Sequence, residues 1–257
     1  MDFGIKDKRV LVTGASQGIG KEIALAFAQE GCLVTIIARK EDELKNVINQ
    51  MKGKGHDYYV ADLMSEGKPT MTAIKLLEQN KRYDIVVHNI GGTLDIKDIF
   101  SPVEDWAKVW QLNVGIAIEM NRFLVPPMQE QKWGRIIHIS SISAESLRGA
   151  GPYGAAKAYV NAYVKVLGRA LAPDGIVVSA LMPGSIYAPH GPWDENSDKN
   201  KHDKEAFYKK RADFLRHHHA IGRLGLAKEI APFAVFMASQ QVTFAQGSII
   251  NIDGGTM

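Results

Sequence analysis

The sequence predicts an α/β fold: a doubly wound parallel sheet of about seven strands with helices on both faces. Short apolar runs alternate with longer windows of helical periodicity along the 257 residues. Such alternation indicates parallel strands joined by crossover helices. The short runs are apolar almost without a break, which is typical of strands buried on both faces. A composition of 46% hydrophobic and 23% charged residues excludes a disordered or collagen-like chain.

The elements follow one another from the N-terminus. Arg9–Thr13 is the first predicted strand, and Gly20–Glu30 is the first helix because Ile23, Ala24 and Phe27 recur at helical spacing. The same patterns predict strands at Leu33–Ala38, His56–Val60, Tyr83–Asn89, Gly134–Ser140, Ile176–Leu181 and Gly247–Ile252, and helices at Glu41–Met51, Tyr153–Leu171 and Lys228–Ala238.

One segment interrupts this alternation. From Ser185 to about Arg223 the chain is polar and irregular, and it includes a charged helical window at Lys204–His219. Long excursions in a compact domain tend to be lids or binding loops. No repeat and no linker-like tract divides the rest, so we expect a single domain over residues 1–257 with a lid-like substrate-binding insertion at about 185–223.

Charge and cysteine content exclude several classes of protein. The 31 Lys and Arg residues nearly balance the 28 Asp and Glu residues, so a nucleic-acid face is not expected. Cys32 is the single cysteine, and the consecutive His217–His219 side chains point apart on a helix, so we expect no metal site. We see no secretory segment and no apolar stretch of about 20 residues. We therefore expect a cytoplasmic protein that binds no membrane.

A glycine-rich turn, Thr13–Gly20, joins the first strand to the first helix. Gly14 permits a tight turn, Gly18 lets the backbone approach a diphosphate, and Gly20 allows the helix to pack closely on the strand. The N–H groups and the dipole of the helix N-terminus favour phosphate binding. The turn therefore predicts a Rossmann-like dinucleotide site.

The end of the second strand bears on the choice of cofactor. NAD sites place an acidic residue there for the ribose 2′-hydroxyl, whereas NADP sites supply a cation for the 2′-phosphate. Here the strand ends in Ala38, and Arg39 follows. The planar fork of Arg suits phosphate oxygens. We expect NADP(H), with NAD(H) as the alternative.

Three further features are candidates for chemistry, although each taken alone also fits an ordinary helix surface, turn or polar helix position. Tyr153 and Lys157 share one helix face, and a nearby ammonium lowers the pKa of a phenol. Ser140 and Ser141 close a strand where open α/β sheets bind ligands. Asn113 lies mid-helix, where Asn is not a favoured residue.

Together these residues closely resemble the short-chain dehydrogenase/reductase family, in its single-domain branch of about 250 residues. The resemblance covers nearly the whole chain, and the motifs occur in the family's order. They are Thr13–Gly20 for T-G-x-x-x-G-x-G, His88–Gly91 for N-N-A-G, Asn113, Ser141, Tyr153 with Lys157 for Y-x-x-x-K, Pro183-Gly184, Gly222–Gly225 and Asp253–Gly255. His88 and Ile90 replace an Asn and an Ala of the family pattern.

The resemblance implies a catalytic set. Tyr153 would be the general acid in reduction and the base in oxidation. Lys157 would lower its pKa and hold the nicotinamide ribose. Ser141 would orient the substrate oxygen, and Asn113 would help hold a water that links Lys157 to solvent. Ser140 stands at the commoner spacing from Tyr153, so the choice between the two serines stays open.

The resemblance also implies a cofactor site, in which Asp62 and Leu63 contact adenine, Asn89 and Gly91 line the adenine ribose, and the segment after Pro183 covers the nicotinamide. The full implied set is Gly14, Ser16, Gln17, Gly18, Ile19, Gly20, Arg39, Asp62, Leu63, Asn89, Gly91, Tyr153, Lys157, Pro183, Gly184 and Ile186.

We expect an NADP(H)-dependent alcohol dehydrogenase or ketone reductase acting on a small polar substrate. Its candidate contacts are Ser143, Arg148, Tyr187, His190 and Trp193. A 3-oxoacyl-carrier-protein reductase and a non-catalytic NADP-binding sensor or scaffold are the alternatives. An enoyl reductase is disfavoured because its Tyr and Lys stand further apart. Family precedent implies a homotetramer or homodimer, with helices at Ser101–Val125 and Gly151–Leu171 as interfaces.

Overall fold

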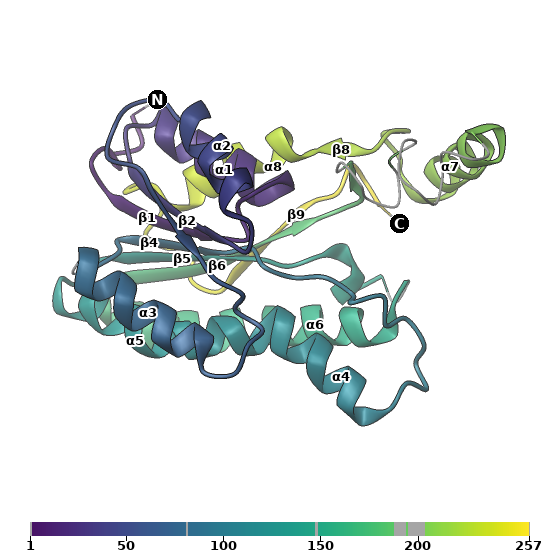
Figure 1. The fold of residues 1–257 in the computed structure, drawn as a ribbon. Helices are drawn as coiled ribbons and strands as arrows, with labels where there is room; N and C mark the ends of the chain where they lie inside the picture. Colours follow the sequence, from purple (N-terminus) through teal and green to yellow (C-terminus); the bar gives the residue numbers. More distant parts are fainter. Residues whose placement is uncertain (1, 81, 147–148, 188–193, 195–203, 257) are drawn as a thin grey trace.

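The computed structural model describes residues 2–80, 82–146, 149–187, 194 and 204–256. Seven parallel strands form one sheet in the order β3-β2-β1-β4-β5-β6-β9, which confirms the predicted sheet (Figure 1). The strands are β1 (Arg9–Thr13), β2 (Leu33–Ala38), β3 (Asp57–Val60), β4 (Ile85–His88), β5 (Gly134–Ile139), β6 (Ile176–Pro183) and β9 (Ser248–Ile252).

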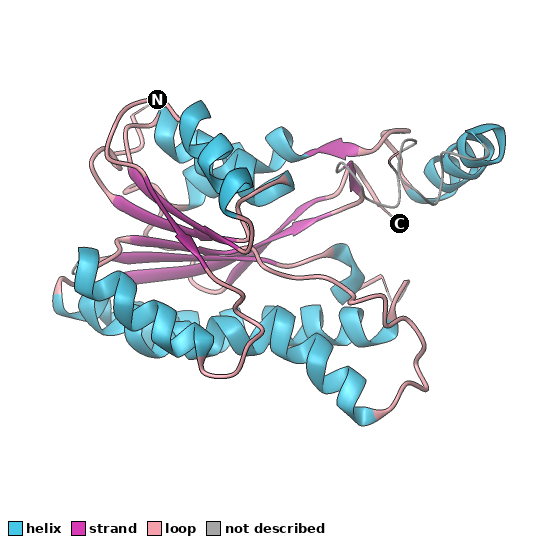
Figure 2. Ribbon diagram, viewed as in Figure 1, coloured by secondary structure: helices cyan, strands magenta, loops and turns pink. Residues whose placement is uncertain are grey.

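Helices cover both faces of this sheet (Figure 2). One face carries α1 (Gly18–Gln29), α2 (Glu41–Gln50) and α8 (Ala227–Met237), and the other carries α3 (Lys68–Asn80), α4 (Val103–Trp110), α5 (Ile116–Glu130) and α6 (Gly151–Leu171). Alternate residues of each central strand enter two separate cores. Val10 and Val12 pack toward α1 and α8, whereas Leu11 between them packs toward α3 and α5. Burial on both faces is why the strand sequences are continuously apolar.

The predicted boundaries differ from the structure by a few residues. The first helix begins at Gly18, not at Gly20, so the last part of the glycine turn is already helical. Strand β4 is shorter than predicted, and β6 continues to Pro183. Between α4 and α5 the chain forms a π-helical turn, Gln111–Gly115, which contains Asn113.

The segment after β6 has structure of its own. A second, two-stranded sheet pairs β7 (Ile186–Tyr187) with β8 (Gly225–Leu226). Helix α7 (Lys204–His218) occupies the predicted charged window and stands out from the rest of the fold (Figure 1). The single domain and the lid remain predictions.

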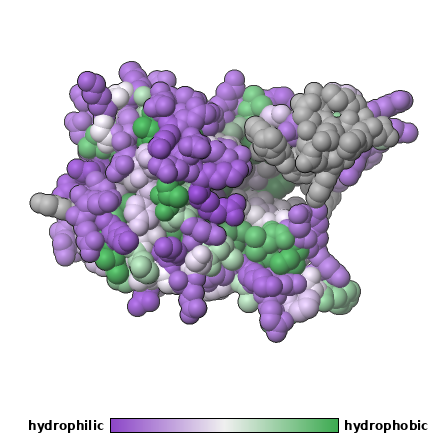
Figure 3. All heavy atoms as spheres, in the orientation of Figure 1, coloured by the Kyte–Doolittle hydropathy of each residue, from purple (hydrophilic) through white to green (hydrophobic). Residues whose placement is uncertain are grey.

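The face of the molecule seen in Figure 3 is mostly hydrophilic, broken by separate hydrophobic spots. Among the described residues, no helix is both long and apolar enough to cross a membrane.

Candidate functional site

The turn between β1 and α1 is shaped to receive a phosphate. Gly14 and Gly18 have φ angles of 65° and 58°, which side-chain-bearing residues rarely adopt. A Cβ at Gly18 would have no heavy atom within 4 Å, so the space above it is open. Within the described residues, no side chain caps the N-terminus of α1, and its first turn holds no acid. Its N–H groups and positive dipole end therefore fit an anionic group such as a diphosphate.

Hydrogen bonds of Asn89 connect this turn to the end of β4. Its side-chain Nδ2 donates to the carbonyl oxygens of Thr13, at 3.1 Å, and Gly14, at 2.9 Å. Its backbone N–H donates to Thr13 Oγ1 at 3.1 Å. A Cβ at Gly20 would lie 2.6 Å from the Gly14 oxygen and would also strike the Asn89 amide. The two motifs that the sequence assigns to the cofactor are therefore in direct contact.

Tyr153, Lys157 and Ser141 come together at the carboxyl end of β5. Tyr153 and Lys157 lie one turn apart on α6, with Lys157 Nζ 5.6 Å from the centre of the Tyr153 ring. Ser141 is hydrogen-bonded to Tyr153, and its Oγ accepts from the backbone N–H of Ser143 at 3.1 Å. Ser140 is buried and donates to Asn161 Oδ1 at 2.6 Å. The geometry thus favours Ser141 over Ser140 as the hydroxyl beside Tyr153.

The electrostatics of this pair depart from the expectation drawn from sequence. Burial raises the pKa of Tyr153, and the interaction with the Ser141 side chain only partly opposes this rise. Lys157 is 3% exposed, donates to the Ile139 carbonyl at 2.7 Å, and has a pKa lowered to about 8 by burial. The net pKa shift of the phenol is therefore upward, opposite to the lowering expected from Lys157, because loss of water dominates in this state of the protein. The phenol is protonated at neutral pH.

Asn113 connects the π-helical turn to the loop after β4. Its Nδ2 donates to the carbonyls of Gly92, at 2.9 Å, and Val109, at 2.8 Å, and its Oδ1 accepts from Gly92 N–H at 3.1 Å. A Cβ at Gly91 would lie 2.6 Å from Asn113 Oδ1 and 2.9 Å from Lys157 Nζ. Gly91, Asn113 and Lys157 thus meet at one point, and only glycine fits between the two side chains.

A buried polar cluster that was not predicted from the sequence adjoins this point. His88 Nε2 lies 2.8 Å from Asn121 Oδ1, and Asn121 Nδ2 donates to the Tyr163 hydroxyl at 3.1 Å. His138 stacks on His88 with ring centres 4.9 Å apart. Burial lowers the pKa of His88 to about 4, so its ring is neutral near pH 7. The partner Asn121 explains how β4 holds a histidine where the family pattern has an asparagine.

The expected adenosine side lies at the ends of β2 and β3. Arg39 follows β2 and is exposed, whereas Lys40 Nζ donates to Glu43 Oε1 at 2.9 Å and the nearby Ser16 side chain helps to lower the pKa of Glu43. Asp62 is exposed and accepts a hydrogen bond from Met64 N–H at 3.1 Å, while Leu63 is buried. Gln17 is exposed at the N-cap of α1, and Ile19 packs partly against the core.

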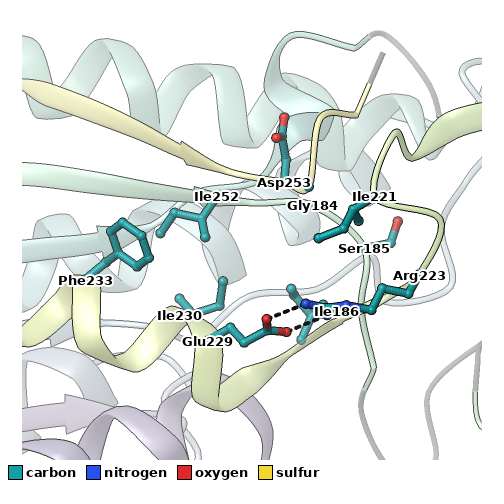
Figure 4. A pocket seen from close by; sticks show the side chains of 12 residues that line it. Gly184, Ser185, Ile186, Ile221, Arg223, Glu229, Ile230, Phe233, Ile252 and Asp253 are labelled. Atoms are coloured by element: carbon teal, nitrogen blue, oxygen red, sulfur yellow. Dashed lines mark hydrogen bonds and ion pairs between the residues drawn. The ribbon is translucent and has the colours of Figure 1, made fainter.

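The segment expected to cover the nicotinamide is hydrogen-bonded to the end of β9. Gly184 N–H donates to the Ile252 carbonyl at 3.0 Å, and a Cβ there would lie 2.8 Å from Asp253 Cα. Ile186 pairs with Gly225 in the small sheet. These residues line one side of a cavity of about 230 Å³, which Arg223 and Glu229 border as an ion pair (Figure 4). Ser141, Tyr153 and Lys157 do not line this cavity.

The expected substrate contacts are only partly described. Ser143 and Tyr187 are half-buried, and the backbone N–H of Ser143 donates to Ser141 Oγ. Arg148, His190 and Trp193 lie outside the described residues. Glu43 and Asn161 were missed by sequence reasoning, although Asn161 follows Lys157 at helical spacing.

Known proteins resemble the chain over nearly all its length. A family model described as Enoyl-(Acyl carrier protein) reductase matches residues 14–257. An uncharacterized oxidoreductase of Mycobacterium tuberculosis is 33% identical, over 98% of this chain and 93% of the relative. The 3-oxoacyl-[acyl-carrier-protein] reductase of Thermotoga maritima is 29% identical over 98% of both chains. The crystal structure of L-sorbose reductase from Gluconobacter frateurii, complexed with NADPH and L-sorbose, superposes with a TM-score of 0.91 at 29% identity, covering 99% of this chain and 98% of that one.

Proposed function

This chain belongs to the short-chain dehydrogenase/reductase family, and we propose that it transfers a hydride between NADP(H) and the carbonyl or secondary alcohol of a small polar substrate. It is an oxidoreductase that acts on carbonyl or hydroxyl groups. The observation that carries the proposal is Lys157, a buried ammonium with no carboxylate partner among the described residues, next to the phenol of Tyr153. A buried unpaired charge is costly, and such groups gather at functional sites.

The residues of the site divide the work of proton transfer. In reduction Tyr153 donates its proton to the substrate oxygen, and its raised pKa keeps it protonated until then. Ser141 holds the same oxygen, and Lys157 stabilises the phenolate that forms, since an adjacent positive charge favours an anion. When bound, NADPH supplies the hydride that the substrate carbon receives. In oxidation Tyr153 acts as the base, which favours higher pH.

Asn113 has a positioning role in this account. Among the described residues, its side chain makes three hydrogen bonds, which go to backbone groups, two of them on Gly92. It therefore holds the Gly91–Gly92 backbone against Lys157. Tyr153, Ser141 and Lys157 are proposed as the groups that touch substrate or cofactor.

NADP(H) is the cofactor that this site fits. The open turn at Gly14–Gly20 would bind the diphosphate, and exposed Arg39 would bind the 2′-phosphate. Asp62 and Leu63 would contact adenine, Asn89 and Gly91 would border its ribose, and Gly184 and Ile186 would cover the nicotinamide. The likeness to an NADPH complex supports this assignment.

A keto sugar or a similar polyhydroxylated compound is the proposed substrate class. The polar segment after β6 and the likeness to a sorbose reductase both support it. The likeness to 3-oxoacyl-[acyl-carrier-protein] reductases keeps a second candidate, a β-ketoacyl thioester. A cytoplasmic homotetramer or homodimer completes the proposal; the single cysteine fits a reducing compartment.

A substrate screen tests the function. Purified protein is mixed with NADPH or NADH and with keto sugars, β-ketoacyl thioesters or small ketones, and loss of reduced-nicotinamide absorbance is followed. We expect turnover with NADPH and a keto sugar. Turnover confined to the thioesters would identify a β-ketoacyl thioester, the second candidate, as the substrate class. Tight NADPH binding without turnover of any carbonyl would indicate a cofactor-binding sensor instead.

A further inference from the structure

We propose that Glu43 sets the cofactor selectivity of this protein, by competing with the 2′-phosphate of NADP(H) for Ser16 and Lys40. The proposal rests on the function proposed above. It concerns a carboxylate that lies where a cationic, hydroxyl-lined site for the 2′-phosphate is expected.

The positions of the three groups follow from the sheet. Strands β1 and β2 are parallel neighbours with Thr13 opposite Ile37, so the residues that follow them meet at one edge. Ser16 lies in the turn after β1, and Lys40 follows β2 as the N-cap of α2. Glu43 is in the first turn of α2, and its side chain lies near Ser16 and Lys40.

Glu43 lies against both donors. Its Oε1 accepts from Lys40 Nζ at 2.9 Å, and the Ser16 side chain is close enough to the carboxylate to lower its pKa. The bond with Lys40, the Ser16 side chain and the nearby charge of Arg39 together lower the pKa of Glu43, so the group is ionised at neutral pH. The side chain of Glu43 is 37% exposed and that of Lys40 74% exposed, so both can move away from each other.

The contact has opposite consequences for the two cofactors. A 2′-phosphate that enters between Arg39 and Ser16 meets a carboxylate of like charge and must take Ser16 and Lys40 from it. A 2′-hydroxyl carries no charge and can itself donate to a carboxylate, as it does to the acidic residue of NAD sites. Glu43 therefore weakens NADP(H) binding while it leaves NAD(H) binding unchanged or strengthens it.

The other acids of the same turn have different surroundings. Glu41 is paired with Lys45 at 3.0 Å and accepts from the Tyr58 hydroxyl at 2.9 Å. Asp42 is exposed, and within the described residues it has no recorded bond with Ser16 or Lys40. Asp42→Asn is therefore a matched control, because it removes one negative charge from the same helix turn without touching the proposed contact.

Equilibrium titration of the full chain with NADP⁺ and NAD⁺ tests the proposal. In Glu43→Gln we expect the Kd for NADP⁺ to fall roughly three- to tenfold, with NAD⁺ unchanged or weaker and with a smaller gain at high salt. Asp42→Asn is expected to change either Kd by less than about twofold. The gain from Glu43→Gln should be smaller in a Ser16→Ala background than in the unmodified chain if the contact acts through Ser16.

Two results would overturn the proposal, and they have different meanings. If the unmodified chain binds NADP⁺ and Glu43→Gln binds it equally or more weakly, Glu43 does not compete with the phosphate and the selectivity role is wrong. If the unmodified chain binds neither dinucleotide, the proposed function fails, and the role of Glu43 fails with it. Thermal unfolding of each variant confirms that the binding measurements compare folded proteins.

Discussion

Burying the charged side chain of Lys157 costs folding free energy, and its described surroundings do not offset this cost. Burial lowers its pKa from the ordinary 10.5 to about 8, and its recorded hydrogen bond goes to the uncharged Ile139 carbonyl. The charged form is therefore less stable in the folded protein than in the unfolded chain. A catalytic role explains why a buried charge is present at this position: Lys157 stabilises the phenolate of Tyr153.

Lys157→Met is expected to stabilise the protein and to abolish turnover. Each pKa unit corresponds to about 1.4 kcal/mol, so the gain in unfolding free energy below pH 8 is at most about 3 kcal/mol, less the lost bond to Ile139. The folded pKa is the lower one, so the cost of Lys157 is greatest below pH 8 and vanishes as pH rises toward 10.5. Denaturant unfolding at pH 7 and pH 10 measures both points. A variant less stable than the parent at pH 7 would contradict this account.

Single residues differ in how far the sequence could predict them. The shared face of Tyr153 and Lys157 follows from helical periodicity alone. The choice of Ser141 over Ser140 does not, because it depends on Asn161, which α6 brings against Ser140. The sign of the Tyr153 pKa shift was also out of reach, because sequence shows neighbours but not burial.

At the scale of elements, glycines decide how closely backbones approach. The glycine turn leaves open space above Gly18, and the loop after β4 brings Gly91 between Asn113 and Lys157. The π-helical turn at Gln111–Gly115 carries Asn113 to that loop. Such turns are rare and occur frequently at functional sites.

Gly18→Ala should weaken NADP⁺ binding by about tenfold or more, which is about 1.4 kcal/mol. The added methyl group lies in the open space expected to take the diphosphate. Gly67→Ala is the matched control, because Gly67 also has a left-handed φ, of 67°, and no atom within 4 Å of a Cβ. Both variants should lose a similar stability, about 1–2 kcal/mol. Equal loss of cofactor binding in the two would exclude a specific role for Gly18.

The strands were the most predictable elements, since burial on both faces makes their sequences continuously apolar. The π-helical turn was not predictable, because it depends on the hydrogen bonds of Asn113 to Gly92 across the fold. The pairing of Ile186–Tyr187 with Gly225–Leu226 was also missed, because two-residue strands have no periodicity.

At the scale of the whole molecule, apolar side chains gather on the outer face of α4 and α6. Tyr159 and Val166 lie two turns apart on α6, 46% and 68% exposed. Trp110 of α4 packs edge-on against Tyr159, with ring centres 5.7 Å apart. Contiguous exposed apolar groups mark interaction sites, and these lie within the helices for which the sequence predicts an interface between subunits.

Val166→Asp should shift the protein toward a smaller assembly in light scattering. The side chain is exposed, so the fold of one subunit should tolerate the charge, whereas a packed interface should not. Met71→Asp is the control, because Met71 is 50% exposed on α3, outside the predicted interface. A monomeric mass for the unmodified protein would rule out the proposed oligomer.

The central claim is that Tyr153 transfers the proton in an NADP(H)-dependent reaction, and Tyr153→Phe tests it most directly. The substitution removes one hydroxyl from a partly buried ring and leaves the glycine turn and Lys157 in place. The measurement is carbonyl-dependent NADPH oxidation, with NADPH binding titrated on the same sample. The account predicts loss of nearly all turnover, at least about a hundredfold, with cofactor binding retained. Turnover close to that of the parent protein would contradict it.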